Sequence, residues 1–272
     1  MAILADCHTH SHFSPDSQEG TEQMIQAAID RNLTHICLTE HMDLDYQVTE
    51  EYPPGRFVLD VDAYYRELLP LQQQYADKIE VGFGIELGMQ PHLNEENTRI
   101  AQSYPFDFII ASSHMVGGID PCWLSREQMG QEQNLYRDYF REELECIRSF
   151  REYDVYGHID YVVRYGKEGD GRYAYRDYSE LFDEMINIFI SRGKGIELNT
   201  SGLRKGLREM NPCTDFLKRY RQMGGEIITV GSDAHCARDV AADFDMAAEI
   251  LRQCGFRYYC VFQNRKPKFR KL

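Results

Sequence analysis

Short apolar runs alternate along the chain with longer segments in which apolar residues recur at helical spacing. Short apolar runs are typical of buried strands, and apolar residues three or four positions apart are typical of amphipathic helices. The predicted strands occupy residues 3–7, 35–39, 81–85, 106–111, 155–156, 195–198, 227–230 and 258–262. The predicted helices occupy residues 21–31, 61–76, 132–150, 179–191, 212–223 and 237–253. Strands and helices are therefore expected to alternate through most of the chain.

This alternation indicates an α/β fold with parallel strands joined by right-handed crossovers. Such strands form either a closed barrel or an open sheet. The chain has 272 residues, is 43% hydrophobic and contains no low-complexity segment, and barrels of this size are commonly single domains. We therefore expect one domain over residues 1–272. The segments 42–60 and 115–131 are too polar and irregular for the core, and are predicted to cover a functional site.

Composition narrows the possible partners. The net charge is −14, so the surface repels phosphate backbones and anionic lipids, and neither nucleic acid nor a membrane surface is expected as a partner. The eight cysteines form no CxxC pair, which is typical of reduced thiols and predicts a cytoplasmic location. No apolar run approaches the ~20 residues that a membrane span needs. The basic cluster within residues 264–272 is predicted to be a solvated, mobile C-terminal tail.

Histidine and carboxylate side chains follow most of the predicted strands. They are His8, His10, Glu86, His41, His114, His158, Asp233 and His235. In a parallel α/β barrel the carboxyl ends of all strands open onto one face, where catalytic residues collect. An open sheet would spread the same residues along an edge. Their positions therefore favour the barrel.

These residue types at these positions predict a metal site. His8 and His10 lie two positions apart in a strand, so they point the same way and can bind one ion. Any single histidine could be an ordinary core or surface residue, but that interpretation would have to hold independently at six equivalent places. Imidazole and carboxylate ligands without thiolate suit catalytic Zn, Mn or Fe. The chain is predicted to be a metal-dependent enzyme.

The strand-end motifs resemble those of the polymerase and histidinol phosphatase (PHP) superfamily. The motifs lie at residues 6–10, 39–41, 84–86, 113–114, 157–160 and 231–235, in family order and over nearly the whole chain. Residues 197–204 and the overall length look like those of the stand-alone histidinol phosphatases. The resemblance implies a distorted, TIM-like (β/α)7 barrel. It also implies hydrolysis of a small phosphomonoester, expected to be the L-histidinol phosphate of histidine biosynthesis.

The resemblance implies three divalent metal ions. By the family pattern His8, His10, Glu86 and Asp233 hold the first ion, Glu86, His114 and His158 the second, and Asp16, His41 and His235 the third. Some branches of the family carry His where this chain has Asp16, which leaves the preferred metal and the occupancy of the third site open. Glu86, Asp233 and His235 are also the expected catalytic residues.

Two cations bridged by one carboxylate can lower the pKa of a shared water from ~15.7 toward ~7. The expected reaction is in-line attack of hydroxide on phosphorus, without a phospho-enzyme intermediate. Arg164 and Arg204 are candidates to bind the phosphoryl group, because a guanidinium can hold two phosphate oxygens at once. Ser201 is a further expected substrate residue, and His12 is a candidate to donate a hydrogen bond or assist the leaving group.

Other interpretations stay open at this point. Another PHP-type phosphoesterase, acting on a sugar phosphate, a nucleotide or phosphotyrosine, would carry the same metal motifs. A polymerase-associated nuclease is disfavoured because the chain shows no basic groove signal, and a non-enzymatic relative is disfavoured because the ligand set is intact. The cationic part of histidinol phosphate should face acidic side chains, for which the candidates are Asp43, Asp45, Glu50 and Glu51. Trp123 and Tyr161 could stack on its imidazole.

Overall fold

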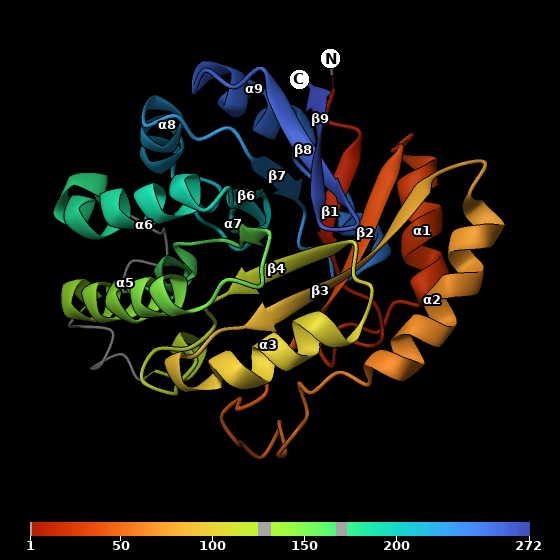
Figure 1. Ribbon diagram of the computed structural model, residues 1–272, viewed down its shortest axis with the longest axis horizontal. Helices are drawn as coiled ribbons and strands as arrows, with labels where there is room; N and C mark the ends of the chain where they lie inside the picture. The colour runs from red at the N-terminus through yellow and green to blue at the C-terminus, as the bar shows by residue number, and fades with distance from the viewer. Residues whose placement is uncertain (1, 125–131, 167–172) are drawn as a thin grey trace.

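Seven parallel strands occupy the centre of the molecule and helices surround them (Figure 1). The computed structural model describes residues 2–124, 132–166 and 173–272. The strands are β1 (Ala5–Thr9), β2 (His35–Met42), β3 (Glu80–Gly88), β4 (Phe108–Ser112), β5 (Val155–Tyr156), β6 (Gly195–Asn199) and β7 (Ile228–Gly231). Each strand pairs in parallel with the next one along the chain. Their residues are buried almost throughout, as expected for strands with helices on one face and a packed interior on the other.

The sheet comes close to closing on itself between β1 and β7. Thr9 forms a parallel bridge with Ala234, just beyond β7. The His10 N–H donates to the Ala234 carbonyl at 2.9 Å, and the Asp233 N–H donates to the His8 carbonyl at 2.8 Å. These contacts join the first and last strands at their carboxyl ends. The predicted single-domain, TIM-like (β/α)7 barrel is therefore confirmed.

The helices cover the outside of the barrel. They are α1 (Thr21–Asp30), α2 (Val61–Tyr75), α3 (Asn94–Ser103), α5 (Glu132–Ser149), α6 (Ser179–Ser191), α7 (Ser201–Arg204), α8 (Thr214–Gln222) and α9 (Phe244–Gln253). Helices α5 and α6 pack together on one side, and α1 and α2 lie on the other (Figure 1). Helix α5 buries Tyr136, Tyr139, Phe140, Leu144 and Ile147 at the predicted helical spacing. The sequence analysis did not predict α3. Only Asn97 and Ala101 of this helix are buried, so its apolar pattern is too weak to recognise.

The prediction of a mobile basic tail over residues 264–272 is wrong. Strands β8 (Tyr258–Gln263) and β9 (Lys266–Lys271) form an antiparallel hairpin, so residues 258–262 form a strand outside the barrel. Arg265 pairs with Asp154, directly before β5, at 2.5 Å, and Arg270 pairs with Glu80, at the start of β3, at 3.0 Å. Two of the basic residues are therefore bound by acids at the amino ends of the barrel strands, and the hairpin covers the end of the barrel opposite the predicted site.

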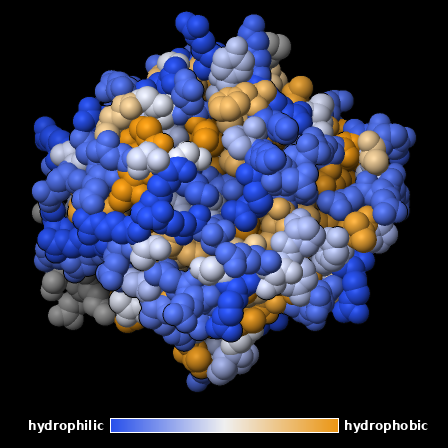
Figure 2. All heavy atoms as spheres, viewed as in Figure 1, coloured by the Kyte–Doolittle hydropathy of each residue, from blue (hydrophilic) through white to orange (hydrophobic). Residues whose placement is uncertain are grey.

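The surface agrees with the acidic, polar composition. The face seen in Figure 2 is mainly hydrophilic, with apolar side chains in several small groups rather than in one patch. In the part of the chain that the structure describes, we find no helix with the length and apolar character required to cross a bilayer. All eight cysteines are unpaired, and six of them are buried, as the lack of paired motifs predicts.

Candidate functional site

The carboxyl ends of the strands bring the nine predicted metal ligands into one group, here called the ligand cluster: His8, His10, Asp16, His41, Glu86, His114, His158, Asp233 and His235. Glu86, on β3, is fully buried at its centre. Its Oε2 lies 2.8 Å from His41 Nδ1, 3.4 Å from His8 Nε2 and 3.6 Å from His10 Nε2. Its Oε1 lies 3.0 Å from His158 Nε2 and 3.4 Å from His114 Nε2. One carboxylate thus faces histidines contributed by four other strands.

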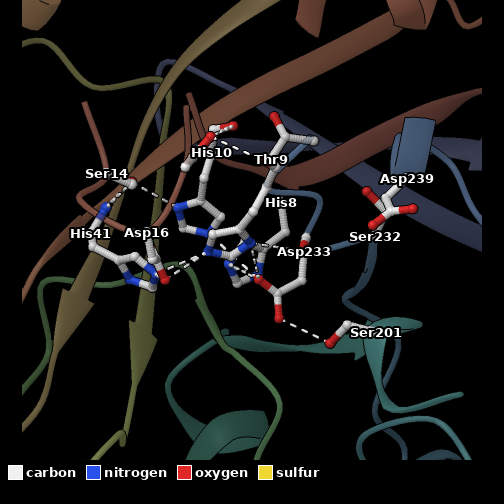
Figure 3. Close-up of polar contacts among 12 residues, drawn as sticks. His8, Thr9, His10, Ser14, Asp16, His41, Ser201, Ser232, Asp233 and Asp239 are labelled. Atoms are coloured by element: carbon white, nitrogen blue, oxygen red, sulfur yellow. Dashed lines mark hydrogen bonds and ion pairs between the residues drawn. The ribbon is translucent and has the colours of Figure 1, made fainter. Parts of the chain in front are cut away.

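Two aspartates complete the cluster on its open side. Asp233 Oδ1 lies 3.5 Å from His10 Nε2 and 3.6 Å from His235 Nδ1. Asp16 Oδ2 lies 3.2 Å from His235 Nε2 and 3.6 Å from His41 Nε2. Figure 3 shows the side chains of His8, His10, His41 and Asp233 turned toward one another. Residues that lie up to 227 positions apart in the sequence therefore meet in one place.

The cluster fits divalent cations. Four overlapping groups hold their ligand atoms within 4.8 Å of one another: His8, His10 and Asp233; His8, Glu86 and His158; His41, Glu86 and His114; and His10, His41 and His235. Among the described residues, Nε2 of His8 and Nε2 of His10 are buried without a hydrogen-bond partner, and the short approach of His41 Nδ1 to Glu86 Oε2 does not have the geometry of a hydrogen bond. A buried polar atom left without a partner costs about 1–3 kcal/mol. A cation bound among these atoms would supply the missing partner.

The pKa values of several ligands are shifted toward the forms that bind a cation. Burial alone would raise the pKa of Glu86, but the facing imidazoles of His8 and His114 hold it well below its usual value. Burial, and then the neighbouring His41 ring, lower the pKa of His10 well below its usual value. The pKa of His8 moves the other way, because Glu197 and Glu86 outweigh the effect of burial. Ionised carboxylates and neutral imidazoles are the forms that bind metals, and a bound cation displaces the proton from a histidine such as His8.

Glu197 is a further candidate for the site that the sequence analysis did not single out. It lies fully buried on β6, where its Oε1 is 2.7 Å from His8 Nδ1 and its Oε2 accepts the His158 N–H at 3.1 Å. A Cβ on Gly231 would lie 2.3 Å from Glu197 Oε1, so glycine there leaves room for the carboxylate. Metal-binding histidines commonly donate their second ring N–H to such a carboxylate, which fixes the ring. An acid inside an otherwise apolar strand was the available signal, because glutamate is rarely buried without a partner.

Two further histidines are supported in the same way. Asp43 Oδ1 lies 2.8 Å from His114 Nδ1. Ser14 Oγ lies 3.0 Å from His10 Nδ1 and donates to Glu40 Oε2 at 2.6 Å. With the proton on Nδ1, each ring presents the lone pair of Nε2 to the ligand cluster. Asp43 was expected to face the substrate, but its carboxylate instead contacts the ring of His114.

The ligand cluster forms one side of a pocket of about 460 Å³ that is also lined by Arg164, Arg204 and Ser201. The Arg164 guanidinium donates to Ser201 Oγ at 2.7 Å and lies 3.5 Å from Asp233 Oδ2. Ser201 Oγ in turn donates to Asp233 Oδ2 at 2.9 Å, a contact drawn in Figure 3. Arg204 donates to the Ser232 carbonyl. Two guanidinium groups and a hydroxyl therefore lie beside the ligand cluster, where they could donate hydrogen bonds to a phosphoryl group.

His12 lies apart from the other candidate substrate-binding residues, Arg164, Arg204 and Ser201. Its exposed ring lies 3.5 Å from Glu67 Oε2 on α2, and His12 is not among the residues that line the pocket. His92 is exposed too, and it pairs with Asp45 at 3.0 Å. Asp45 is not among the residues that line the pocket either.

The two irregular segments line the pocket, as the sequence predicts. Tyr46, Tyr52 and Phe57 come from the first segment, and Asp120, Cys122 and Trp123 from the second. Tyr161, in the 3₁₀ turn Tyr161–Tyr165, lines it as well. Residues 125–131 of the second segment lie outside the described residues. Side chains from loops thus enclose the space that the ligand cluster leaves open.

Comparison with known proteins gives a consistent result. The family model of the PHP domain matches residues 6–201. A probable histidinol-phosphatase of Clostridium acetobutylicum is 33% identical over 98% of this chain and 100% of the relative, and the histidinol-phosphatase of Lactococcus lactis is 32% identical over 96% and 95%. The crystal structure of the Lactococcus lactis histidinol phosphate phosphatase, complexed with Zn, L-histidinol and phosphate, superposes with a TM-score of 0.83 at 29% identity and covers 98% of this chain and 99% of that chain.

Proposed function

The chain belongs to the PHP domain family, and from this premise we propose that it is a histidinol-phosphatase, which hydrolyses L-histidinol phosphate to L-histidinol and phosphate. Its similarity to histidinol-phosphatases over nearly their whole length supports this substrate. The observation that carries the proposal is the ligand cluster, with all nine side chains in one group beside a pocket that is lined by two arginines.

We propose three divalent ions, which are Zn, Mn or Fe, as cofactors. His8, His10 and Asp233 would hold the first, His114 and His158 the second, and Asp16, His41 and His235 the third. Glu86 lies between the first two sets and is the carboxylate suited to bridge them. When bound, such ions supply water of lowered pKa and offset the charge of the phosphoryl group. Glu86, Asp233 and His235 are the proposed catalytic residues.

The remaining residues orient the substrate and the ligands. Arg164, Arg204 and Ser201 would bind the phosphoryl oxygens, because their donors border the pocket beside the ligand cluster. Asp233 connects the two functions, since its Oδ1 faces the histidines while its Oδ2 accepts from Ser201. Preorganised donors of this kind stabilise charge that develops during phosphoryl transfer. The loops from residues 42–60 and 115–124 would limit the access of bulk water.

Metal analysis combined with substrate screening tests the proposal. Purified protein should contain divalent metal, release phosphate from histidinol phosphate much faster than from sugar phosphates, nucleotides or phosphotyrosine, and lose activity to a chelator until metal is restored. Turnover of the other phosphomonoesters with none of histidinol phosphate would assign a different phosphoesterase. A protein without bound metal whose activity does not respond to chelation would overturn the metal site itself.

A further inference from the structure

One carboxylate in the pocket differs from the others in its partners. The carboxylates that line the pocket belong to Asp16, Asp43, Asp120, Asp233 and Asp239. Four of them lie close to a cationic or imidazole nitrogen: Asp16 at 3.2 Å from His235, Asp43 at 2.8 Å from His114, Asp233 at 3.5 Å from His10, and Asp239 at 3.7 Å from Arg204. Within residues 2–124, 132–166 and 173–272, Asp120 has no such partner, although only 5% of it is exposed.

The groups around Asp120 hold it in place without neutralising it. The Tyr46 hydroxyl donates to Oδ2 at 2.8 Å, and the Cys122 N–H donates to Oδ1 at 2.9 Å. The Tyr161 hydroxyl lies 3.5 Å from both oxygens. Burial, and then the charge of Asp120, raise the pKa of the Cys122 thiol to about 12 and that of Tyr46 well above its usual value. The donors to Asp120 are thus a hydroxyl and a backbone N–H rather than cations, so no counter-charge lies against this carboxylate within the described residues.

Aromatic rings border this carboxylate. Tyr46, Tyr52, Phe57 and Trp123, here called the aromatic wall, are successive ring neighbours: the centroids are 4.5 Å apart for Tyr46 and Phe57, 5.1 Å for Phe57 and Tyr52, and 6.2 Å for Tyr52 and Trp123. Trp123 lines the pocket with 43% of its surface exposed. Aromatic faces attract cations and stack on flat heterocycles. The aromatic wall and Asp120 together match a ligand that carries positive charge and an aromatic ring.

We propose that Asp120 and the aromatic wall form the subsite that binds the cationic organic part of the substrate, an alkylammonium carrying an imidazole. This inference rests on the proposed function and divides the pocket between two ends of one molecule. The phosphoryl group lies at the ligand cluster, Arg164 and Arg204, and the ammonium or imidazolium lies against Asp120. Asp120 is then a specificity-determining residue, which distinguishes histidinol phosphate from phosphomonoesters of neutral alcohols.

Kinetics on two substrates test the subsite. For Asp120→Asn, the KM for histidinol phosphate should rise about 10- to 100-fold, because a charge-assisted hydrogen bond in a buried site is lost. Hydrolysis of glycerol 3-phosphate, which has no cation, should stay within about twofold of wild type. Asparagine keeps an acceptor for the Cys122 N–H or the Tyr46 hydroxyl. The matched control is Glu142→Gln. The Glu142 carboxylate accepts the N–H of Gly117, which lies in the same loop as Asp120, at 2.8 Å. This variant should leave the kinetics on both substrates unchanged.

Equal loss on both substrates would show that Asp120 only supports the loop, and unchanged kinetics on both would remove it from the site. Failure of the wild-type protein to hydrolyse histidinol phosphate would overturn the proposed function but not the subsite. The subsite is then decided by inhibition of glycerol 3-phosphate hydrolysis by L-histidinol. Inhibition that is weakened at least about tenfold in Asp120→Asn supports it, and equal inhibition of both proteins overturns it.

Discussion

The ligand cluster and the aromatic wall border the same pocket but are built in different ways. Residues of the ligand cluster follow parallel strands, and carboxylates such as Glu197 and Asp43 support their rings. Residues of the aromatic wall lie in irregular segments and contact one another mainly through their rings. Strand ends hold side chains precisely enough for metal chemistry, whereas loops can change without disturbing the barrel. This difference is consistent with the proposed division, in which the ligand cluster would determine the reaction and the aromatic wall would determine which alcohol is released.

The largest effect should come from the centre of the ligand cluster. Glu86→Gln removes the charge that faces five imidazoles, so hydrolysis of histidinol phosphate and glycerol 3-phosphate should both fall by more than about a thousandfold. Bound metal, measured by mass spectrometry, should fall as well. The circular dichroism spectrum should remain that of wild type. Loss of activity on only one of the two substrates would contradict the division between the ligand cluster and the aromatic wall.

A smaller effect, again on both substrates, is expected from the carboxylate behind the ligand cluster. Glu197→Gln keeps the size of the side chain but replaces the carboxylate that orients His8, so metal affinity should fall about 10- to 100-fold. Titration of the metal-free protein with Zn²⁺ or Mn²⁺ measures this loss directly, apart from activity.

The matched control is Glu143→Gln, which changes another buried glutamate that lies on α5, outside the ligand cluster. Burial raises the pKa of Glu143 well above its usual value, and neither of its carboxylate oxygens has a hydrogen-bond partner among the described residues, so glutamine removes no polar contact. Metal affinity should therefore be unchanged in this variant. An equal loss in both variants would mean that any buried glutamate affects the site through the fold, and Glu197 would have no specific role.

Arg204 should matter for both substrates through the phosphoryl group that they share. Arg204→Ala should raise both KM values more than about tenfold, because a guanidinium contact with phosphate is lost, while the metal content stays the same. Arg238→Ala is the control, since this arginine is 87% exposed and lies outside the pocket lining. An unaltered KM for Arg204→Ala would remove Arg204 from the phosphate site.

The ligand cluster was readable from the sequence for a physical reason. In a parallel barrel the carboxyl ends of the strands share one face, so residues such as His8 and Asp233 could be placed together once the strands were recognised. The apolar spacing of α5 gave its boundaries almost to the residue, because that helix buries a wide apolar face. In these regions the pattern of apolar and polar residues along the chain is enough to predict where the residues lie in the fold.

Other features depend on contacts that no local pattern contains. The basic C-terminal residues form a strand because they pair with β8, and Asp154 and Glu80 bind Arg265 and Arg270 from elsewhere in the chain. The sequence could not distinguish Asp120 from the many other acids of this acidic chain. Asp120 stands out only in the structure, where no cationic or imidazole nitrogen among the described residues pairs with it. His12 follows the metal motif closely in sequence, yet the chain turns its ring toward α2. Proximity along the chain was misleading for His12.

The smallest effect should come from the edge of the aromatic wall, and it tests the division of the pocket most finely. Trp123→Leu keeps an apolar side chain but removes the aromatic face, and an exposed cation–π contact of about 0.5–1 kcal/mol corresponds to a rise of about two- to fivefold in the KM for histidinol phosphate. The KM for glycerol 3-phosphate and the metal content should not change. Tyr258→Leu is the matched control, because Tyr258 is 49% exposed against 43% for Trp123 but lies on β8 at the other end of the barrel. A selective rise in Trp123→Leu alone would extend the substrate preference beyond Asp120 to the aromatic wall. Equal behaviour of the two variants would confine that preference to the carboxylate.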